Sequence, residues 1–163
     1  YGQIDRIESI NNRMFIFKNG TMYEANEGST FNNFFSTQYD TEVDLLFNSD
    51  FSHDKMLKNI STESDEPWNF TEITCPKVGL STNQTTRLAE SNFIRRDDVW
   101  YADVKRNVNT PAGQLPPGKS GLVAGQPLIG KVYEITMKDD STEESKIHFI
   151  NFGWQNQPGH RIV

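Results

Sequence analysis

Acidic side chains are the residues of this chain that could perform acid–base chemistry, since the sequence holds 22 aspartates and glutamates. A glycosidase needs two carboxyl groups that face one cleft at a defined separation. Glu72, Asp103 and Glu134 are candidates for such a pair, but among so many acidic residues some candidates arise by chance. We therefore expect these carboxylates to be solvated surface groups, and the sequence assigns no catalytic residue.

The single cysteine and the three histidines offer a second kind of chemistry. One cysteine, Cys75, forms no intramolecular disulfide and no multi-cysteine metal site. A cysteine nucleophile needs a histidine partner, and His53, His148 and His160 are scattered along the sequence. Cys75 is therefore interpreted as a small, half-buried residue of a strand.

An acidic run at residues 139–144 could bind calcium through several oxygen ligands. The EF-hand pattern of alternating ligands around a central glycine is missing, so a solvated hairpin turn is the preferred interpretation. The histidines show no HExxH spacing, and no glycine-rich run matches a phosphate-binding loop. The sequence thus predicts no metal site, no cofactor and no cofactor-binding residue.

Three tryptophans, Trp68, Trp100 and Trp154, could stack on sugar rings, as they do in carbohydrate-binding modules. Tryptophans of β-sandwiches more often anchor the core or an interface. Both interpretations stay open from the sequence.

Length and charge narrow the class of protein. At 163 residues the chain can bury one good core, so one main domain is expected. A net charge of −6 argues against direct binding to nucleic acid, which needs clustered lysine and arginine. No apolar run approaches the roughly 18 residues that cross a bilayer, so no membrane insertion is expected. The chain begins in the middle of a pattern at Tyr1, without methionine, and we expect a fragment or processed piece of a longer polypeptide.

Short strands without helical periodicity run along most of the chain. Asn19-Gly20 lies between two apolar runs and predicts a β-hairpin over residues 13–25, because both residues tolerate the positive φ of a type I′ turn. Further strands are expected at residues 41–48, 56–62, 70–74, 87–94 and 99–106. Trp100, Ala102 and Val104 share one face of the last of these.

The clearest hairpin signal lies near the end of the chain. Residues 131–137 alternate with Tyr133, Ile135 and Met137 inward, and residues 146–154 are expected to return across a charged turn with Ile147 and Phe149 inward. Strands at this spacing predict an all-β fold, an antiparallel, jelly-roll-like β-sandwich preceded by a β-hairpin.

Polar residues at 26–36 predict a boundary between two parts of the chain. Residues 1–29 are expected to form a β-hairpin segment at the end of a larger β-rich body, and residues 30–163 the β-sandwich domain. A long loop at residues 107–127 contains four of the seven prolines. Such a stretch is either an exposed functional or docking loop, or disordered.

Several short blocks, in a fixed order, carry a resemblance to a known family. They run from Arg6 to Gly153 and comprise residues 14–24, 32–35, 43–48, 55–60, 93–102 and 128–135. Their order and spacing resemble a β module in large virion structural proteins of tailed bacteriophages, including the tail muzzle or stabilisation proteins of crAss-like phages. The loop at 107–127 is longer than in this pattern.

The resemblance implies a non-enzymatic structural component of a bacteriophage virion. Its expected role is that of a tail muzzle or stabilisation domain that mediates tail assembly near the portal-distal end of a short tail. The implied partners are other tail proteins and copies of itself in a symmetric ring, and the implied location is the virion tail. The family supplies no catalytic residues to carry over. The alternative is a carbohydrate- or host-receptor-binding β-sandwich module, with a host surface glycan as partner.

Overall fold

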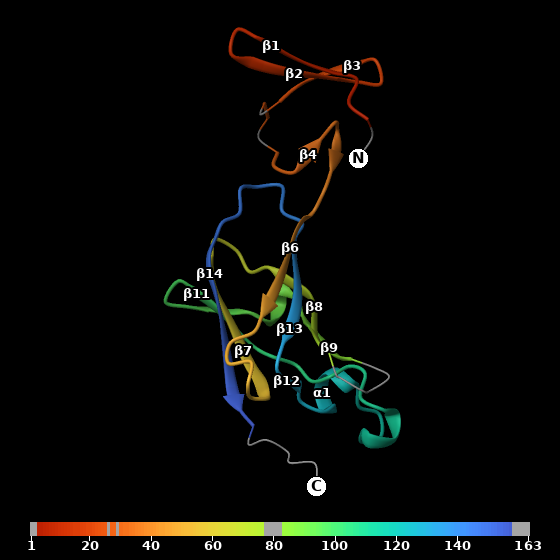
Figure 1. The fold of residues 1–163 in the computed structure, drawn as a ribbon, viewed down its shortest axis with the longest axis vertical. Helices are drawn as coiled ribbons and strands as arrows, with labels where there is room; N and C mark the ends of the chain where they lie inside the picture. The colour runs from red at the N-terminus through yellow and green to blue at the C-terminus, as the bar shows by residue number, and fades with distance from the viewer. Residues whose placement is uncertain (1–2, 26, 29, 77–82, 158–163) are drawn as a thin grey trace. The chain divides into compact units, whose positions relative to one another are not determined.

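The computed structural model describes residues 3–25, 27–28, 30–76 and 83–157 and is built mainly from antiparallel strands (Figure 1). It divides into two compact units. The N-terminal unit comprises Tyr1–Asp40 and Asp140–Glu144, and the sandwich unit comprises Thr41–Asp139 and Ser145–Val163. Among the described residues, no helix is long and apolar enough to span a bilayer.

The N-terminal unit contains a three-stranded sheet in the order β1–β2–β3, with β1 at Arg6–Ile10, β2 at Arg13–Lys18 and β3 at Thr21–Glu24. Asn19 and Gly20 have φ angles of 52° and 75°, as a type I′ turn requires, so the predicted hairpin is confirmed. Asn11 and Asn12 form a similar turn with φ of 51° and 63°. This turn adds β1, which the sequence pattern did not predict.

Apolar side chains on this sheet stay partly in water. Ile7, Ile16 and Tyr23 are cross-strand neighbours on one face. Phe35, which lies between β4 (Asn33–Phe34) and β5 (Thr37–Gln38), meets Tyr23 edge-on with ring centroids 5.0 Å apart. The Lys18 ammonium lies 4.1 Å from the centre of the Phe35 ring. None of the residues described in this unit is buried, so the sheet has no closed core of its own.

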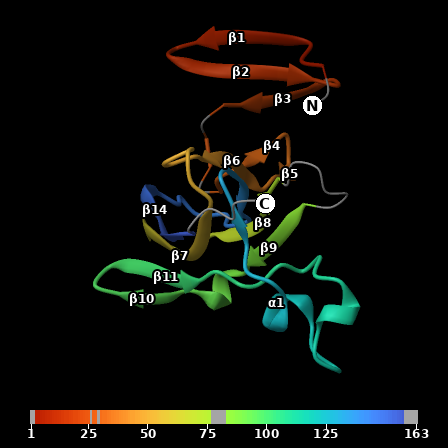
Figure 2. The same ribbon diagram turned by 60° about the horizontal axis from the view of Figure 1, so that its bottom comes forward.

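The first sheet of the sandwich unit is centred on β7 (Lys55–Ser64). It also contains β10 (Ile94–Arg96), β11 (Val99–Asp103), β12 (Ile129–Gly130) and β14 (Ile147–Asn156). β14 pairs with β7 along its full length, and β11 pairs with it from Asn59 to Thr62. Asp97 and Asp98, with φ of 48° and 64°, form the turn between β10 and β11 (Figure 2).

The second sheet has the order β6–β13–β8–β9. Its strands are β6 (Thr41–Phe47), β13 (Tyr133–Asp139), β8 (Asn69–Cys75) and β9 (Gln84–Leu88). The strand predicted at residues 87–94 is wrong, because the chain leaves β9 at Leu88 and turns through the 3₁₀ helix η1 (Glu90–Asn92). Side-chain amides fix this turn: Asn92 Oδ1 accepts from the Ala89 N–H and Asn69 Oδ1 from the Glu90 N–H.

The core lies between the two sheets, where their inward rows meet. On β13 the residues Tyr133, Ile135 and Met137 are buried, as their alternation predicts. Leu57, Ile60 and Ala102 face them from the first sheet, and the buried set is completed by Trp68, Phe70, Ile73, Cys75, Leu88, Phe93 and Leu128. This packing of two antiparallel sheets confirms the predicted all-β sandwich class.

The hairpin predicted near the end of the chain is wrong. β13 pairs with β6 and β8, whereas β14 pairs with β7, so the connection crosses from one sheet to the other. An irregularity between Ile147 and Phe149 shifts the register of β14. Phe149 is therefore 44% exposed, while Ile150 and Phe152 pack against the core.

The two ends of the proline-rich loop at 107–127 are joined by a backbone hydrogen bond. The Asn107 N–H donates to the Gln126 carbonyl at 2.8 Å, and the buried Asn107 Oδ1 accepts from the Thr85 N–H at 3.0 Å. The loop contains the 3₁₀ helix η2 (Ala112–Gln114) and the short helix α1 (Gly121–Ala124). It has a defined backbone path, and a docking role for it stays a prediction.

Cys75 is fully buried at the end of β8, not half-buried as the sequence pattern suggested. Its sulfur occupies the space beside Gly130, because a Cβ atom added at Gly130 would overlap Cys75 Sγ. The same Cβ would lie 3.8 Å from Cys75 Cβ, which is an ordinary contact. The glycine and the cysteine therefore depend on each other for packing.

Gly130→Ala is expected to lower the free energy of unfolding by about 1–3 kcal/mol, because its methyl group overpacks the site. In a Cys75→Ala background the sulfur is gone, so the same substitution should cost close to nothing. Urea unfolding of the wild type, both single variants and the double variant measures this coupling. An equal cost of Gly130→Ala in both backgrounds would contradict the packing described here.

Candidate functional site

A groove of about 800 Å³ opens on the outer face of the first sheet, beside the β10–β11 hairpin. Its size lies within the range of small-molecule sites. Its polar and aromatic lining comes from β7, η1, β10, β11 and the residues that follow, and includes Asn59, Asn92, Arg96, Tyr101, Asp103 and Lys105.

Strand register places these side chains together. Tyr101 pairs with Ile94, and Asp103 pairs with Asn59. Directly paired residues of antiparallel strands share a face, and residues two apart on a strand lie roughly 7 Å from one another. Because Trp100 and Ala102 point into the core, Tyr101 and Asp103 must point outward. The groove thus follows from the alternation that builds the core.

The Asn59 amide occupies the space that a side chain at position 153 would fill. A Cβ atom added at Gly153 on β14 would overlap Asn59 Oδ1 and lie 3.0 Å from Asn59 Nδ2. Gly153 is the register partner of Asn59, so the amide lies over the bare glycine backbone. The Asn59 amide, one of the groups that line the groove, thus extends over the glycine of β14.

Opposite charges balance in the groove. Arg96 and Lys105 are basic, and Asp97 and Asp103 are acidic, so the formal charges cancel. Tyr101 is 43% exposed and Ile94 is 60% exposed. Within the part of the chain that the structure describes, no hydrogen bond or ion pair engages the Tyr101 hydroxyl. The site offers an aromatic face together with donors and acceptors for a polar ligand.

The three tryptophans are not gathered on one exposed face. Trp68 is 5% exposed, and its indole N–H donates to Ser145 Oγ at 3.0 Å. Trp100 is half-buried and donates to the Ser64 carbonyl at 3.2 Å. Trp154 is 39% exposed and lies against Phe47, with ring centroids 5.3 Å apart. Trp68 and Trp100 are thus anchors of the sandwich, and a platform of all three, which the sequence left open as the alternative, does not form.

The three candidate carboxylates do not share a cleft. Glu72 and Glu134 lie on the outer face of the second sheet, where their neighbours Ile73 and Ile135 point into the core. Asp103 lies on the outer face of the first sheet. The full thickness of the core separates Asp103 from the other two. Asp103 therefore cannot pair with Glu72 or Glu134 in one cleft.

The remaining candidates from the sequence are also apart. Cys75 is buried, and His148 is exposed on β14. His160 lies outside the described residues. Among those that are described, no group of three histidine, cysteine or acidic side chains could hold a metal ion. Within the acidic run at 139–144, the Thr142 carbonyl accepts a hydrogen bond from the Phe31 N–H at 2.8 Å.

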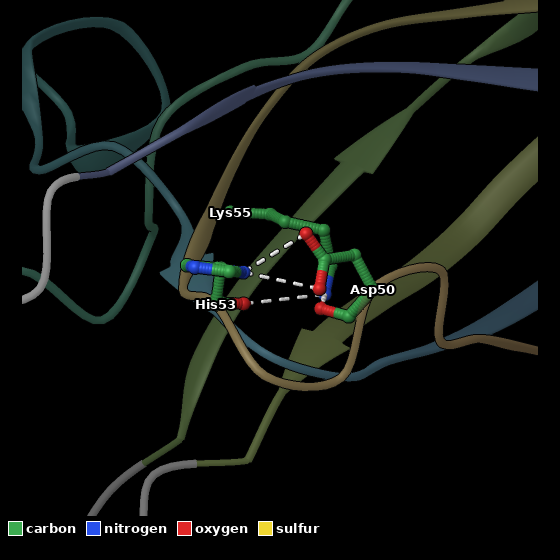
Figure 3. A network of polar contacts seen from close by, with 3 residues as sticks. All are labelled: Asp50, His53 and Lys55. Atoms are coloured by element: carbon green, nitrogen blue, oxygen red, sulfur yellow. Dashed lines mark hydrogen bonds and ion pairs between the residues drawn. The ribbon is translucent and has the colours of Figure 1, made fainter.

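One polar cluster, Asp50–His53–Lys55, combines groups that often do chemistry (Figure 3). His53 Nδ1 lies 3.0 Å from Asp50 Oδ2, and this hydrogen bond lowers the pKa of Asp50. Lys55 Nζ donates to the Asp50 carbonyl at 2.9 Å and lies 3.4 Å from the His53 carbonyl. The Lys55 ammonium thus points toward the backbone carbonyls of the turn that precedes β7.

Lys55 closes one end of the sandwich. Its side chain is fully buried, and burial lowers its pKa. The Tyr133 hydroxyl donates to the Lys55 carbonyl at 2.5 Å, so β13 of the second sheet contacts β7 of the first. Burial raises the pKa of Tyr133 well above its ordinary value. This arrangement anchors a turn, and Lys55 has no open cleft before it in which to act as a nucleophile.

Replacing Lys55 with methionine should change how stability depends on pH. Because its pKa is lowered in the folded chain, the unfolded chain binds more protons between that value and 10.5. The free energy of unfolding of the wild type should therefore rise as pH increases through this window. Lys55→Met should lack this contribution.

Urea unfolding from pH 7 up to about 9.5, where unfolded tyrosines are still largely neutral, measures the slope. Lys58→Met is the matched control, because Lys58 is exposed on the same strand and should keep the wild-type slope. Identical pH profiles for Lys55→Met and the wild type would show that Lys55 is not desolvated as described.

The groove was missed by sequence reasoning, although one signal could have found it. The alternation that places Trp100, Ala102 and Val104 on the inner face leaves Tyr101, Asp103 and Lys105 on the outer one. The contribution of Asn59 could not be found this way, because it depends on pairing between β7 and β11. Nor does the pattern of β11 reveal η1, which supplies Asn92.

Comparison with known proteins gives a match to a family of virion proteins. Residues 29–107 match the family of the Crassvirus muzzle protein C-terminal domain. The matched segment contains β4 to β11 and thus most of the groove. A search of the curated proteins found no match to the chain. The muzzle protein is a component of the crassvirus virion tail. The match over residues 29–107 supports assignment of the chain to a crassvirus muzzle-type family and suggests a phage structural role.

Proposed function

We infer that this chain is a non-enzymatic building block of the phage tail that mediates tail assembly through contact surfaces. Its partners would be copies of itself in a symmetric ring and other tail proteins. The family match supports a structural role and contact with other virion proteins. The assembly role, the ring and the absence of catalysis are the parts that we propose.

The assembly proposal rests on one structural observation: the sheet β1–β2–β3 of the N-terminal unit has no buried residue among those described. We call it the open sheet. No described residue of this unit is buried, yet large apolar side chains stand exposed on it, including Ile4, Ile7, Ile10, Met14 and Met22. The register places Ile7 and Met14 on one face of the sheet and Ile10 and Met22 on the other. Exposed apolar residues on a sheet face are typical of protein interfaces. A neighbouring tail subunit that covers this sheet would supply the core that the unit lacks.

The sandwich unit suits the role of a rigid support. Its core is closed by both sheets, and its outer faces carry many charged and hydroxyl side chains. The net charge of −6 favours solubility of single subunits before they assemble. We also propose, as the sequence suggested, that residues 1–29 end a larger β-rich body and that residues 30–163 form the attached domain.

An acidic substitution on the open sheet should block assembly without unfolding the sandwich. Ile7 is 54% exposed, so Ile7→Asp should change the stability of the free chain little. In an interface the same charge would be buried without a partner, which is costly. We expect particles made with Ile7→Asp to contain about tenfold fewer copies of the subunit.

Leu46→Asp is the matched control, because Leu46 is 67% exposed on the outer face of the second sheet. Quantitative mass spectrometry of purified virions counts the incorporated subunits, and a virion reconstruction locates them. Normal incorporation of Ile7→Asp, or loss of Leu46→Asp alone, would show that assembly does not use the open sheet.

The second candidate function is binding of a carbohydrate or another host receptor. The groove beside the β10–β11 hairpin favours it, because this groove combines an exposed aromatic ring with polar side chains on a rigid sheet. The two functions are compatible, since the groove lies in the sandwich unit and the open sheet in the N-terminal unit.

A further inference from the structure

We propose that the groove on the outer face of the β10–β11–β7 sheet binds a neutral saccharide. The Tyr101 ring is the stacking surface, and Asn59, Asp103 and Lys105 bind the sugar hydroxyls. This inference gives the ligand class and the contacting residues of the second candidate function, and it rests on that function. It is independent of the assembly role.

The chemistry of the lining matches that of a sugar ring. A pyranose has faces of C–H groups, which pack on an aromatic ring, and a rim of hydroxyls, which both donate and accept hydrogen bonds. Tyr101 is 43% exposed and supplies the ring. Asp103 accepts hydrogen bonds, Lys105 donates them and Asn59 does both. A sugar hydroxyl can therefore act as donor or as acceptor in this groove.

Register brings these groups within the span of one sugar. Asp103 follows Tyr101 by two residues on β11, roughly 7 Å along the same face. Asn59 is directly opposite Asp103 on β7, where paired Cβ atoms lie about 5 Å apart. An aromatic ring, a carboxylate and an amide are therefore neighbours on one flat surface.

The charges favour a neutral ligand over an anionic one. Arg96 and Lys105 are offset by Asp97 and Asp103, so no net positive potential draws an anion to the groove. For a sialylated or sulfated glycan, the attraction to Arg96 and Lys105 would be offset by repulsion from Asp97 and Asp103. Nucleic acid is disfavoured for the same reason.

The groove is prepared before any ligand arrives. The Asn59 amide lies over Gly153, and η1 is fixed by hydrogen bonds from the Ala89 N–H to Asn92 and from the Glu90 N–H to Asn69. A wall and a hydrogen-bonding group that are already in place lose little conformational entropy on binding.

A peptide that adds a strand to the sheet edge is the less favoured occupant. The edge strand β10 has three residues, which offers a short ladder for strand addition. The groove residues Tyr101, Asp103 and Asn59 instead lie on the face of inner strands. A sugar ring that stacks on Tyr101 needs the exposed face of the sheet and not its edge.

The experiment is a titration of the full chain with saccharides, followed by isothermal calorimetry and by NMR of the tyrosine side chains. Maltotriose, mannotriose and chitotriose are the neutral probes, and 3′-sialyllactose is the anionic probe. We expect at least one neutral probe to bind and to shift the Tyr101 resonances, and 3′-sialyllactose to bind more weakly. If none of the neutral probes binds, or if the anionic probe binds more tightly, the inference is wrong.

Variants of the groove identify the contacts. Tyr101→Ala should weaken binding of the neutral probe about tenfold, and Asp103→Asn, which keeps the shape, about fivefold. Phe149→Ala is the matched control, because Phe149 is 44% exposed on β14 and lies outside the groove lining. Thermal unfolding shows whether each variant folds. Equal loss in Phe149→Ala, or unchanged affinity in the folded Asp103→Asn variant, would overturn the assignment of these residues.

Adsorption of the labelled chain to host cells separates this inference from the function on which it rests. Adsorption that the free neutral saccharide competes away would support both. Adsorption that is unaffected by saccharide but lost after protease treatment of the cells would keep the receptor function and refute the sugar. Absence of adsorption would remove the receptor function, while the assembly role would stand on its own test.

Discussion

The sandwich depends on the contact between its two central strands, β7 and β13. Each of them has partners on its own sheet, and the inward side chains of both meet in one core. The buried row of Tyr133, Ile135 and Met137 on β13 removes apolar surface from water, which is the dominant favourable term in folding. At one end the Tyr133 hydroxyl also donates to the Lys55 carbonyl, so the sheets are linked by a hydrogen bond as well as by packing.

This constraint also determines what the outer faces can do. Because side chains alternate along β11 and both Trp100 and Ala102 point into the core, Tyr101 and Asp103 face outward. The irregularities in β14 have a similar effect, because one of them leaves Phe149 exposed while Ile150 returns to the core. Binding surfaces on this fold are therefore by-products of a pattern whose first role is stability.

Local pattern predicted the strands and the class of fold but not all of the pairing. The alternation of β13 and the Asn19-Gly20 turn are encoded by neighbouring residues, so both could be read from the sequence. The partner of β14 is not encoded locally: the charged turn before it looked like a hairpin turn, yet the strand pairs with β7. The end of β9 at Leu88 depends on amides of Asn69 and Asn92, and the long-range one leaves no periodic signal.

The sequence predicted even less of the candidate site than of the strand pairing. Tyr101 could be assigned to an outer face, but Asn59 joins it only through the register of β7 with β11. The buried position of Lys55 contradicts the usual exposure of lysine, and only the turn that receives its ammonium explains it. In the same way, the sequence favoured anchor positions for Trp68 and Trp100 but left a surface platform open, and only the folded core decides between them.

The burial of Cys75 has a consequence for the environments through which a virion passes. It is the only cysteine of the chain, and its sulfur is sealed behind Gly130. Thiols stay reduced in a cytosol and become prone to oxidation outside the cell. Since this sulfur is shielded from oxidants, and no cystine bridge is required for folding, the same fold can persist from the reducing interior of the host to the oxidising medium outside it.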